Sequence, residues 1–167
     1  MIGNDVIDIL QSRLESNWRR KGFIQKLFTP EEQLLISNTA DPEIMVWLLW
    51  SMKEAAYKIY HRQTKIREYI PQKLVCSIIS QDHNAIKGTV ACLDKVYFTE
   101  TILSKDRIHT VAVSSLHDLC NIIEIEKKSI IKDKEGIPNW FNIKHNQMKA
   151  ASVSHHGRFE LCVSLNY

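Results

Sequence analysis

The segment spanning residues 42–61 constrains the fold more than any other part of the chain. Asp41, Pro42 and Glu43 form a helix start, because a capping side chain, a proline at the first helical position and an acid near the positive helix end all favour initiation. A helix that is apolar on nearly every side is buried on most of its faces. The segment therefore predicts a long helix through the core. Its apolar residues are Ile44, Met45, Val46, Trp47, Leu48, Leu49, Trp50, Met52, Ala55, Ala56 and Ile59.

Three charged residues interrupt the apolar surface of this helix. Lys53, Glu54 and Lys58 lie in its middle, and Glu54 and Lys58 share a face because they are four residues apart. An ordinary stabilising ion pair explains that spacing. A functional site explains it too, since burying a charge in apolar surroundings is costly unless the charge is paired or binds a ligand. Both interpretations stay open, and the cost of burial favours the site.

Elsewhere the pattern places helices before strands. Residues 2–9 are typical of a strand and 10–27 of a polar, basic helix, and the Thr-Pro-Glu-Glu run at 29–32 starts another helix. Helices early and strands later predict an α+β fold. Further strands are expected at 74–79, 87–98, 109–113, 122–125, 140–143 and 158–165, with a turn at 136–138 and a short helix at 144–150.

Composition narrows the class of protein. With 167 residues, 44% of them hydrophobic, the chain is long enough for one domain with its own core. The net charge of +3 is too small for the basic footprint of a nucleic-acid-binding protein. The four cysteines show no CxxC spacing, which does not support a structural zinc site. An acid at position 5 and no apolar run longer than residues 44–50 argue against a signal peptide or a membrane span, and predict a cytoplasmic protein.

Two parts of the chain offer groups for binding phosphate or metal. Asp5 and Asp8 lie in an apolar strand, where acids are depleted, and Asp5 together with Glu54 would offer Mg²⁺ two carboxylates beside substrate phosphates. A helix cap or a turn acid is the alternative for Asp5. The Ser-His-His-Gly-Arg run at 154–158 combines imidazole and guanidinium groups that suit phosphate, and a polar hairpin turn without a ligand is its alternative.

A local basic patch lies in the first third of the chain. It is either a solvated face or a dock for an acidic partner, and the sequence leaves both open. Its members are Arg13, Arg19, Arg20, Lys21 and Lys26.

Several segments together resemble the 4'-phosphopantetheinyl transferase superfamily. The run Gly-Asn-Asp-Val-Ile-Asp-Ile at 3–9 is similar to the family's Gly-x-Asp opening. The run Trp-Ser-Met-Lys-Glu-Ala-Ala-Tyr-Lys at 50–58 matches its long motif Trp-(Ser/Thr)-x-Lys-Glu-(Ala/Ser)-x-x-Lys. Residues 28–32 stand where the family has an aromatic, a small polar and then an acidic residue. Residues 136–138 and 153–159 resemble its Gly-x-Pro and Ser-His-x-x-x-aromatic elements.

The resemblance implies an enzyme that moves the phosphopantetheine arm of coenzyme A onto a serine of an acidic acyl or peptidyl carrier protein, as in fatty-acid biosynthesis and related lipid metabolism. It implies that Asp5 and Glu54 hold magnesium on the pyrophosphate, and that Lys58 contacts phosphate with Lys53 as a helper. Glu54, or a water that it orients, is implied as the base for the acceptor serine. His155 and Arg158 are implied to contact the ribose phosphate side of coenzyme A.

Two departures from the family pattern matter. Members with Gly-x-Asp-x-Glu carry a second acid where this chain has Ile7, which favours a holo-acyl-carrier-protein-synthase-like metal site with fewer carboxylates. Asp8 is a candidate substitute for the second acid. The missing acid also leaves open the alternative that this chain is a non-catalytic member of the same fold that binds coenzyme A or a carrier protein.

The Ser-His element comes last in this chain, as in small synthases that form trimers with sites between subunits. Residues 107–114 and 158–164 each run from a basic residue through an apolar strand to Val-Ser. This echo predicts that the single domain 1–167 contains two pseudo-symmetric lobes, about 1–118 and 119–167. A monomer with an internal site and a homotrimer are both expected possibilities, with neither nucleic acid nor a membrane as partner.

Overall fold

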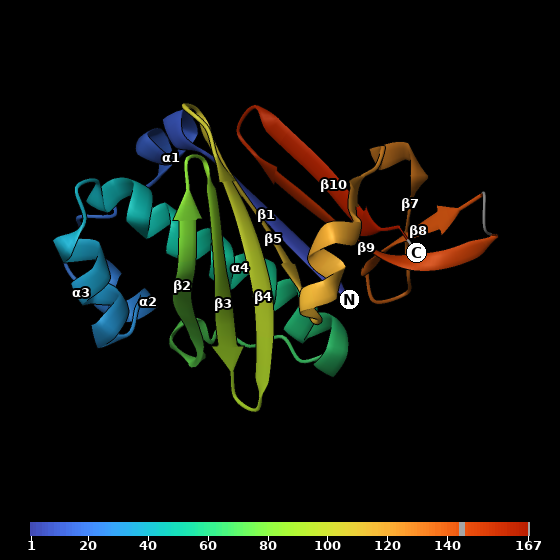
Figure 1. Cartoon of the computed structure of the whole chain (residues 1–167), viewed down its shortest axis with the longest axis horizontal. Coiled ribbons are helices and arrows are strands. Elements are labelled where there is room, and N and C mark those ends of the chain that lie inside the picture. The colour runs from blue at the N-terminus through green and yellow to red at the C-terminus, as the bar shows by residue number, and fades with distance from the viewer. Residues whose placement is uncertain (144–145, 167) are drawn as a thin grey trace.

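The computed structural model describes residues 1–143 and 146–166, and it has two five-stranded antiparallel sheets, which confirms the α+β class. Figure 1 shows the helices packed beside and behind the first sheet, and the second sheet on the opposite side of the molecule. The first sheet has the order β1 (Ile2–Asp8), β5 (Arg107–Val113), β4 (Lys95–Leu103), β3 (Ala85–Cys92) and β2 (Leu74–Asp82). The second has the order β6 (Ile122–Glu124), β10 (Phe159–Leu165), β9 (Gln147–His156), β8 (Pro138–Asn142) and β7 (Ile130–Lys132).

The long central helix is present as predicted. It is α4 (Pro42–Thr64), capped by the Asp41 side chain and ended by Lys65 in the left-handed region at φ 61°. Its apolar side chains pack on one face of the first sheet, where Met52, Ala56 and Ile59 share a buried cluster with residues of β3 and β5. Gly3 of β1 lies so close to this helix that a Cβ there would come within 2.1 Å of the Ala55 carbonyl oxygen. This close approach brings β1 and α4 into contact and requires glycine at position 3.

Shorter helices cover the start of α4. They are α1 (Ile9–Glu15), α2 (Phe23–Leu27) and α3 (Pro30–Asn38), and three short 3₁₀ turns follow, η1 (Pro71–Lys73), η2 (Leu116–Asn121) and η3 (Lys127–Ser129). The predicted start at Thr29 is confirmed, since its side chain and that of Glu32 form a reciprocal capping box. None of the helices in residues 1–143 and 146–166 is long and apolar enough to cross a membrane.

Three predicted elements differ from the structure. The helix expected over 10–27 is two short helices, because the backbone becomes extended at Ser16 and helix resumes only after Gly22, which caps α2 with a left-handed φ of 81°. The strand expected over 87–98 is a hairpin of β3 and β4 that turns near Leu93, whose φ is 56°. The helix expected over 144–150 is wrong from residue 147 on, because that stretch pairs with β8 as part of β9, and residues 144–145 lie outside the described chain.

The two sheets meet along β1 and β9 through side chains. The backbone N–H groups of Asn4, Val6 and Asp8 point away from β5, and each donates to a side chain of β9. Alternate residues of β9 thus satisfy alternate donors of β1, which would otherwise be buried without partners. The acceptors are Ser152 Oγ at 2.9 Å, Ser154 Oγ at 2.9 Å and His156 Nδ1 at 2.8 Å.

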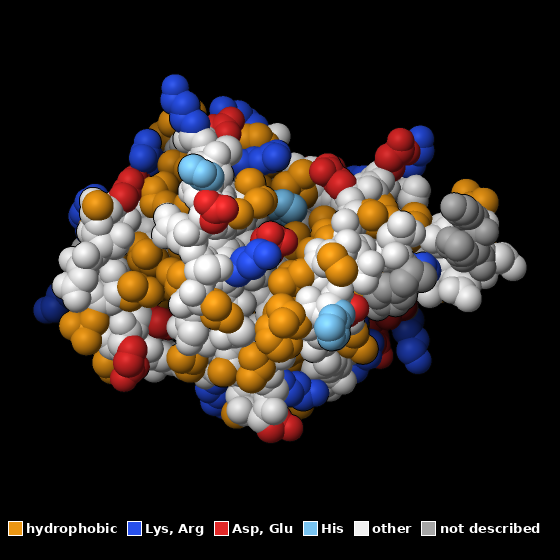
Figure 2. All heavy atoms as spheres, viewed as in Figure 1, with side chains coloured by type: hydrophobic (Ala, Val, Ile, Leu, Met, Phe, Trp, Pro, Cys, Tyr) orange, Lys and Arg blue, Asp and Glu red, His pale blue; other side chains and the backbone are white. Residues whose placement is uncertain are grey.

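The outer face of the first sheet, opposite α4, carries exposed apolar side chains, and Figure 2 shows hydrophobic groups spread over it. Among them are Val75, Ile79, Val96 and Ile102. The predicted lobe boundary near residue 118 falls in the connection between the two sheets, and the similarity of two lobes stays a prediction.

Candidate active site

Asp5 is the central acid at the junction of the two sheets. It lies on β1, and its side chain is 14% exposed. Ser154 Oγ donates to Asp5 Oδ1 at 3.2 Å, whereas Asp5 Oδ2 is buried and has no hydrogen-bond partner among the described residues. Burial raises the pKa of Asp5, and the positive charge of Lys58 partly opposes that rise. An unpartnered buried carboxylate oxygen is costly, and it marks a place where a cation or a donor is missing.

Glu54 faces Asp5 from α4. Burial, and next the negative charge of Asp5, raise its pKa to about 7, and Lys58 opposes them. Within residues 1–143 and 146–166, the Glu54 carboxylate has no hydrogen-bond partner. Two carboxylates with raised pKa values that repel one another are typical of a functional site.

Lys58 connects the helix to both sheets. Its ammonium donates to the backbone oxygen of Asn4 at 2.5 Å and to that of Val153 at 3.1 Å, and it lies 3.9 Å from Asp5 Oδ1. Burial lowers its pKa, and the charges of Asp5 and Glu54 oppose that effect. The sequence-predicted trio Asp5, Glu54 and Lys58 is therefore brought together.

The structure places Lys53 elsewhere. Its side chain is 1% exposed, and its ammonium lies 2.7 Å from Glu32 Oε2 and donates to the backbone oxygens of Pro71 and Leu74. Glu32 in turn accepts a hydrogen bond from the Cys76 backbone N–H at 2.8 Å. Because its donors are occupied by these buried partners, Lys53 ties α4 to α3 and β2 and does not join the group around Asp5.

Asp8 forms hydrogen bonds with the turn between β9 and β10. Arg158 donates to it from Nε at 2.8 Å, from Nη2 at 2.9 Å and from its backbone N–H at 3.0 Å, and these bonds lower the pKa of Asp8. Asp8 also caps α1. Gly157 lies against it, since a Cβ there would come within 2.5 Å of Asp8 Oδ2. Asp8 thus has a structural partner, and Arg158, whose side chain is 53% exposed, is held by this buried acid.

His155 and His156 are adjacent in β9, so their side chains point in different directions. His155 is exposed and lines a cavity of about 240 Å³ together with Asp5 and Glu54. His156 turns toward α1, where its Nε2 lies 3.2 Å from Glu15 Oε2. The predicted site residue His155 is therefore on the same cavity as the two carboxylates, which we call the carboxylate cavity.

A basic cavity on the other side of Lys58 was not foreseen. It has a volume of about 150 Å³, and its lining includes three cations, Lys58, Arg62 and Arg67, and one acid, Glu135, beside the Gly136–Pro138 turn. Arg62 is anchored there by donating to Ala151 O at 2.7 Å and to Asn139 Oδ1 at 3.0 Å. The signal that could have found Arg62 is its place four residues after Lys58, on the same face of α4.

The donor set fits a magnesium ion held partly by substrate. No cluster of three or more His, Cys, Asp or Glu side chains suited to a metal occurs in the part of the chain that the structure describes. Mg²⁺, however, commonly binds through one or two carboxylates, with phosphates and waters completing the octahedron. Asp5 Oδ2, which has no partner among the described residues, and the neighbouring carboxylate of Glu54 meet that requirement.

Comparisons with known proteins agree with this geometry. No curated protein matches the chain significantly. The family model of the 4'-phosphopantetheinyl transferase superfamily matches residues 1–114, which include β1, α4 and the remaining strands of the first sheet. The match covers more than half of the chain and contains Asp5, Glu54 and Lys58. This chain therefore belongs to the 4'-phosphopantetheinyl transferase superfamily.

Proposed function

We propose that this protein transfers the phosphopantetheine arm of coenzyme A to the serine hydroxyl of an apo carrier protein, with Mg²⁺ bound by Asp5 and Glu54. One observation carries the proposal: two mostly buried carboxylates with raised pKa values line the carboxylate cavity beside Lys58, which lines the basic cavity, and one carboxylate oxygen has no partner among the described residues. Phosphoryl transfer needs chiefly positioning and charge neutralisation, and this arrangement provides both.

The basic cavity suits the phosphorylated end of coenzyme A. Lys58, Arg62 and Arg67 offer positive charge there, and hydrogen bonds to backbone oxygens hold Lys58 and Arg62 in place. A fixed cation loses less conformational entropy on binding than a mobile one. Mg²⁺ held by the two carboxylates would neutralise part of the negative charge of the pyrophosphate. Lys58 then contacts the same pyrophosphate from the side of the basic cavity.

The acceptor serine reaches phosphorus through the carboxylate cavity. Its oxygen forms a bond to the phosphorus that carries pantetheine, the bond from that phosphorus to the bridging oxygen breaks, and adenosine 3',5'-bisphosphate leaves. The serine proton passes to Glu54, directly or through one water. Without a bound cation the pKa of Glu54 is about 7, and Mg²⁺ at the carboxylates would lower it and keep Glu54 ionised, ready to accept the proton.

The carrier protein docks on the basic patch. Arg19, Arg20 and Lys21 are exposed there, near the helices that border the carboxylate cavity, and they favour an acidic carrier. Arg13 contributes less, because it donates to both carboxylate oxygens of Glu43, with the shortest contact at 2.8 Å.

The activity is tested with coenzyme A, Mg²⁺ and a panel of apo acyl and peptidyl carrier proteins, read as a mass gain of one phosphopantetheine on the carrier. We expect a gain with at least one carrier, and Glu54→Gln should abolish it while the protein stays folded. The control is Glu31→Gln on the exposed surface of α3. Absence of any gain at high enzyme concentration across the panel would overturn the proposal.

One observation favours a second candidate, a non-catalytic member that binds coenzyme A or a carrier protein. Ile7 is 6% exposed and apolar where a further acid would join the metal site. Binding of coenzyme A that depends on Mg²⁺, without transfer to any carrier, would favour this candidate.

A further inference from the structure

Ser152 and Ser154 of β9 occupy matching places at the junction of the two sheets. They are 3% and 5% exposed, and each side-chain oxygen accepts a hydrogen bond from a backbone N–H of β1 at 2.9 Å. They differ in one contact. The Ser154 hydroxyl also lies 3.2 Å from Asp5 Oδ1, whereas no carboxylate accepts from Ser152 among the described residues. Ser152 joins the sheets, and Ser154 in addition touches the proposed active site.

The single proton of the Ser154 hydroxyl is directed at Asp5. A serine hydroxyl has one proton to donate and two lone pairs that accept. The Val6 N–H can only donate, so it occupies a lone pair of Ser154 and leaves the proton for another acceptor. An ionised carboxylate only accepts, and Asp5 Oδ1 receives this proton. The two neighbours together fix the orientation of the hydroxyl.

The contacts of the Asp5 carboxylate fall on one of its two oxygens. Ser154 donates to Oδ1, and the ammonium of Lys58 lies 3.9 Å from the same oxygen. Oδ2 is buried and has no partner in the part of the chain that the structure describes. The Ser51 hydroxyl donates to the backbone oxygen of Asp5 at 3.4 Å, which holds the strand in place. The protein thus holds one carboxylate oxygen and leaves the other for a ligand.

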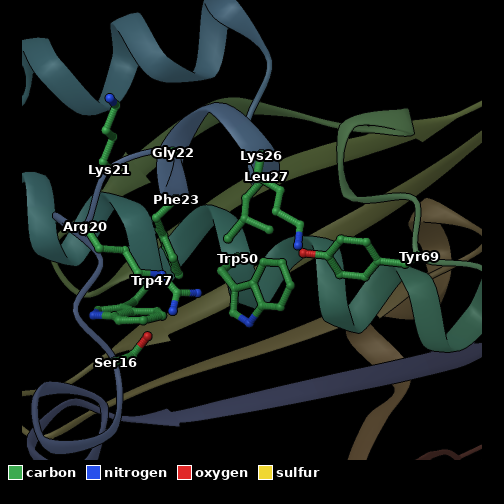
Figure 3. Close-up of a pocket in the computed structure, with 10 residues that line it drawn as sticks. All are labelled: Ser16, Arg20, Lys21, Gly22, Phe23, Lys26, Leu27, Trp47, Trp50 and Tyr69. Atoms are coloured by element: carbon green, nitrogen blue, oxygen red, sulfur yellow. The ribbon is translucent and has the colours of Figure 1, made fainter.

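The aromatic wall of the carboxylate cavity offers Asp5 no hydrogen bond. Trp47 and Trp50 form this wall, and both also line a second cavity of about 480 Å³ between α2 and α4, shown in Figure 3. The indole N–H of Trp47 is a donor, but it is buried without a partner among the residues described, so it does not reach Asp5. The orientation of the Asp5 carboxylate therefore depends on the polar groups of the junction, and Ser154 is the one that the second sheet contributes.

We propose that Ser154 is a positioning residue for the metal, whose hydroxyl holds Asp5 Oδ1 so that Oδ2 is presented to Mg²⁺. The proposal rests on the proposed function, which makes Asp5 a ligand of that ion. Groups that hydrogen-bond to a metal ligand orient it, and their loss typically weakens metal binding by about 10- to 100-fold. The second sheet thus takes part in the metal site without supplying a ligand.

Two other roles compete for Ser154. The first is a purely structural joint, which Ser152 provides with an equivalent hydrogen bond to β1, and the contact with Asp5 distinguishes the two serines. The second is direct contact with a substrate phosphate. Phosphate oxygens accept hydrogen bonds and need a donor, and the one proton of Ser154 is already donated to Asp5. The geometry therefore favours positioning over both.

The test measures Mn²⁺ binding to the protein without coenzyme A. Mn²⁺ takes the same oxygen ligands as Mg²⁺, and free Mn²⁺ is counted by its electron paramagnetic resonance signal. We expect Ser154→Ala to raise the Kd for Mn²⁺ by about tenfold or more. Ser152→Ala is the matched control, because it also removes an acceptor of a β1 N–H. It should lose a similar amount of stability in urea and keep the wild-type Kd.

Transfer assays add a second measurement. Ser154→Ala should need a higher Mg²⁺ concentration for half-maximal transfer and should approach the wild-type kcat when Mg²⁺ is saturating. A higher KM for coenzyme A with an unchanged Kd for Mn²⁺ would instead show contact with substrate and overturn the positioning role. If Ser154→Ala does not fold, Ser154→Cys decides, since a thiol fills nearly the same space and is a weak donor. A wild-type Kd in that variant overturns the proposal.

The reference variant Asp5→Asn separates this proposal from the proposed function. If Asp5→Asn weakens Mn²⁺ binding and Ser154→Ala does not, or if Ser152→Ala weakens it equally, the role of Ser154 is overturned and the assignment of Asp5 stands. If Asp5→Asn binds Mn²⁺ as the wild type does, Asp5 is no ligand and both assignments fail. A wild type that binds no Mn²⁺, with or without coenzyme A, refutes both as well.

Discussion

At the residue scale, Asp5 and Glu54 are held in a state that costs stability. Both carboxyl groups are mostly buried and close enough to raise each other's cost of ionisation, with Lys58 as the compensating charge beside them. Hydrogen bonds around the trio satisfy Asp5 Oδ1 and the lysine, and leave Asp5 Oδ2 without a partner among the residues that the structure describes. A site that stores such an uncompensated cost is poised to bind a cation.

The protonation of Glu54 gives the first prediction. Its pKa is raised in the folded protein from 4.5 to about 7, so the folded state binds more protons than the unfolded state between these values. Stability contributed by this group is therefore present below pH 4.5 and is lost as pH rises to about 7, by about 3 kcal/mol. We expect Glu54→Gln to be more stable than the wild type at pH 8, and this advantage to vanish near pH 5. Denaturant unfolding at both pH values measures it, and Glu31→Gln is the control.

The second prediction concerns the metal. Without substrate, millimolar Mg²⁺ should raise the unfolding free energy of the wild type by about RT ln(1 + [Mg²⁺]/Kd). Asp5→Asn and Glu54→Gln should lose this gain, because each removes one of the two carboxylates. Thermal unfolding with and without Mg²⁺ measures the effect. An equal gain in wild type and Asp5→Asn would contradict the assignment of Asp5.

At the scale of elements, α4 carries two lysines with different tasks. Lys53 joins α4 to α3 and β2 through a fully buried ion pair, whereas Lys58 joins it to β1 and β9 at the edge of the cavities. In the sequence both lysines belong to one motif, and both are predicted to contact the substrate. It could not separate them, because their partners lie 21, 54 and 95 positions away along the chain and are brought close only by tertiary packing.

The third prediction follows from this division. Lys53→Met leaves Glu32 charged and buried without its partner, and should cost about 3–5 kcal/mol of stability. Lys58→Met should cost less, about 1–3 kcal/mol for the backbone acceptors that it leaves, and should abolish transfer. Urea unfolding and transfer assays below the unfolding transition measure both. If folded Lys53→Met loses as much turnover as Lys58→Met, Lys53 acts on substrate.

At the scale of the whole molecule, the sequence predicted the elements that depend on neighbouring residues, and it missed features that depend on residues far apart in the chain. The helix at α4 and the strand at β1 follow from periodicity and capping, which neighbouring residues determine. The start of β9 at Gln147 does not follow from local sequence. Residues 147–150 show no strand pattern, and they form a strand only because they pair with β8. The basic cavity was missed for the same reason, since Arg62 of α4 and Arg67 after it lie beside the Gly136–Pro138 turn, which is about 70 positions away along the chain.

The arrangement of the sheets decides the last prediction. Asp5 and Glu54 come from the first half of the chain and His155 from β9, yet the three line one cavity of a single chain. We therefore expect a complete site in each monomer, whereas a homotrimer with shared sites would need residues from two copies. The exposed apolar face of the first sheet permits association without changing that expectation.

Mixing variants tests this arrangement. Glu54→Gln and His155→Ala each damage one half of the site, and sites formed within one chain stay damaged when the two proteins are mixed. Sites formed between chains would instead recover up to about a quarter of wild-type transfer in a mixed dimeric contact, since intact halves then meet by chance. Transfer assays on the mixture after unfolding and refolding together measure this, with sedimentation giving the oligomeric state. Recovered activity would show that Asp5 of one copy works with His155 of another.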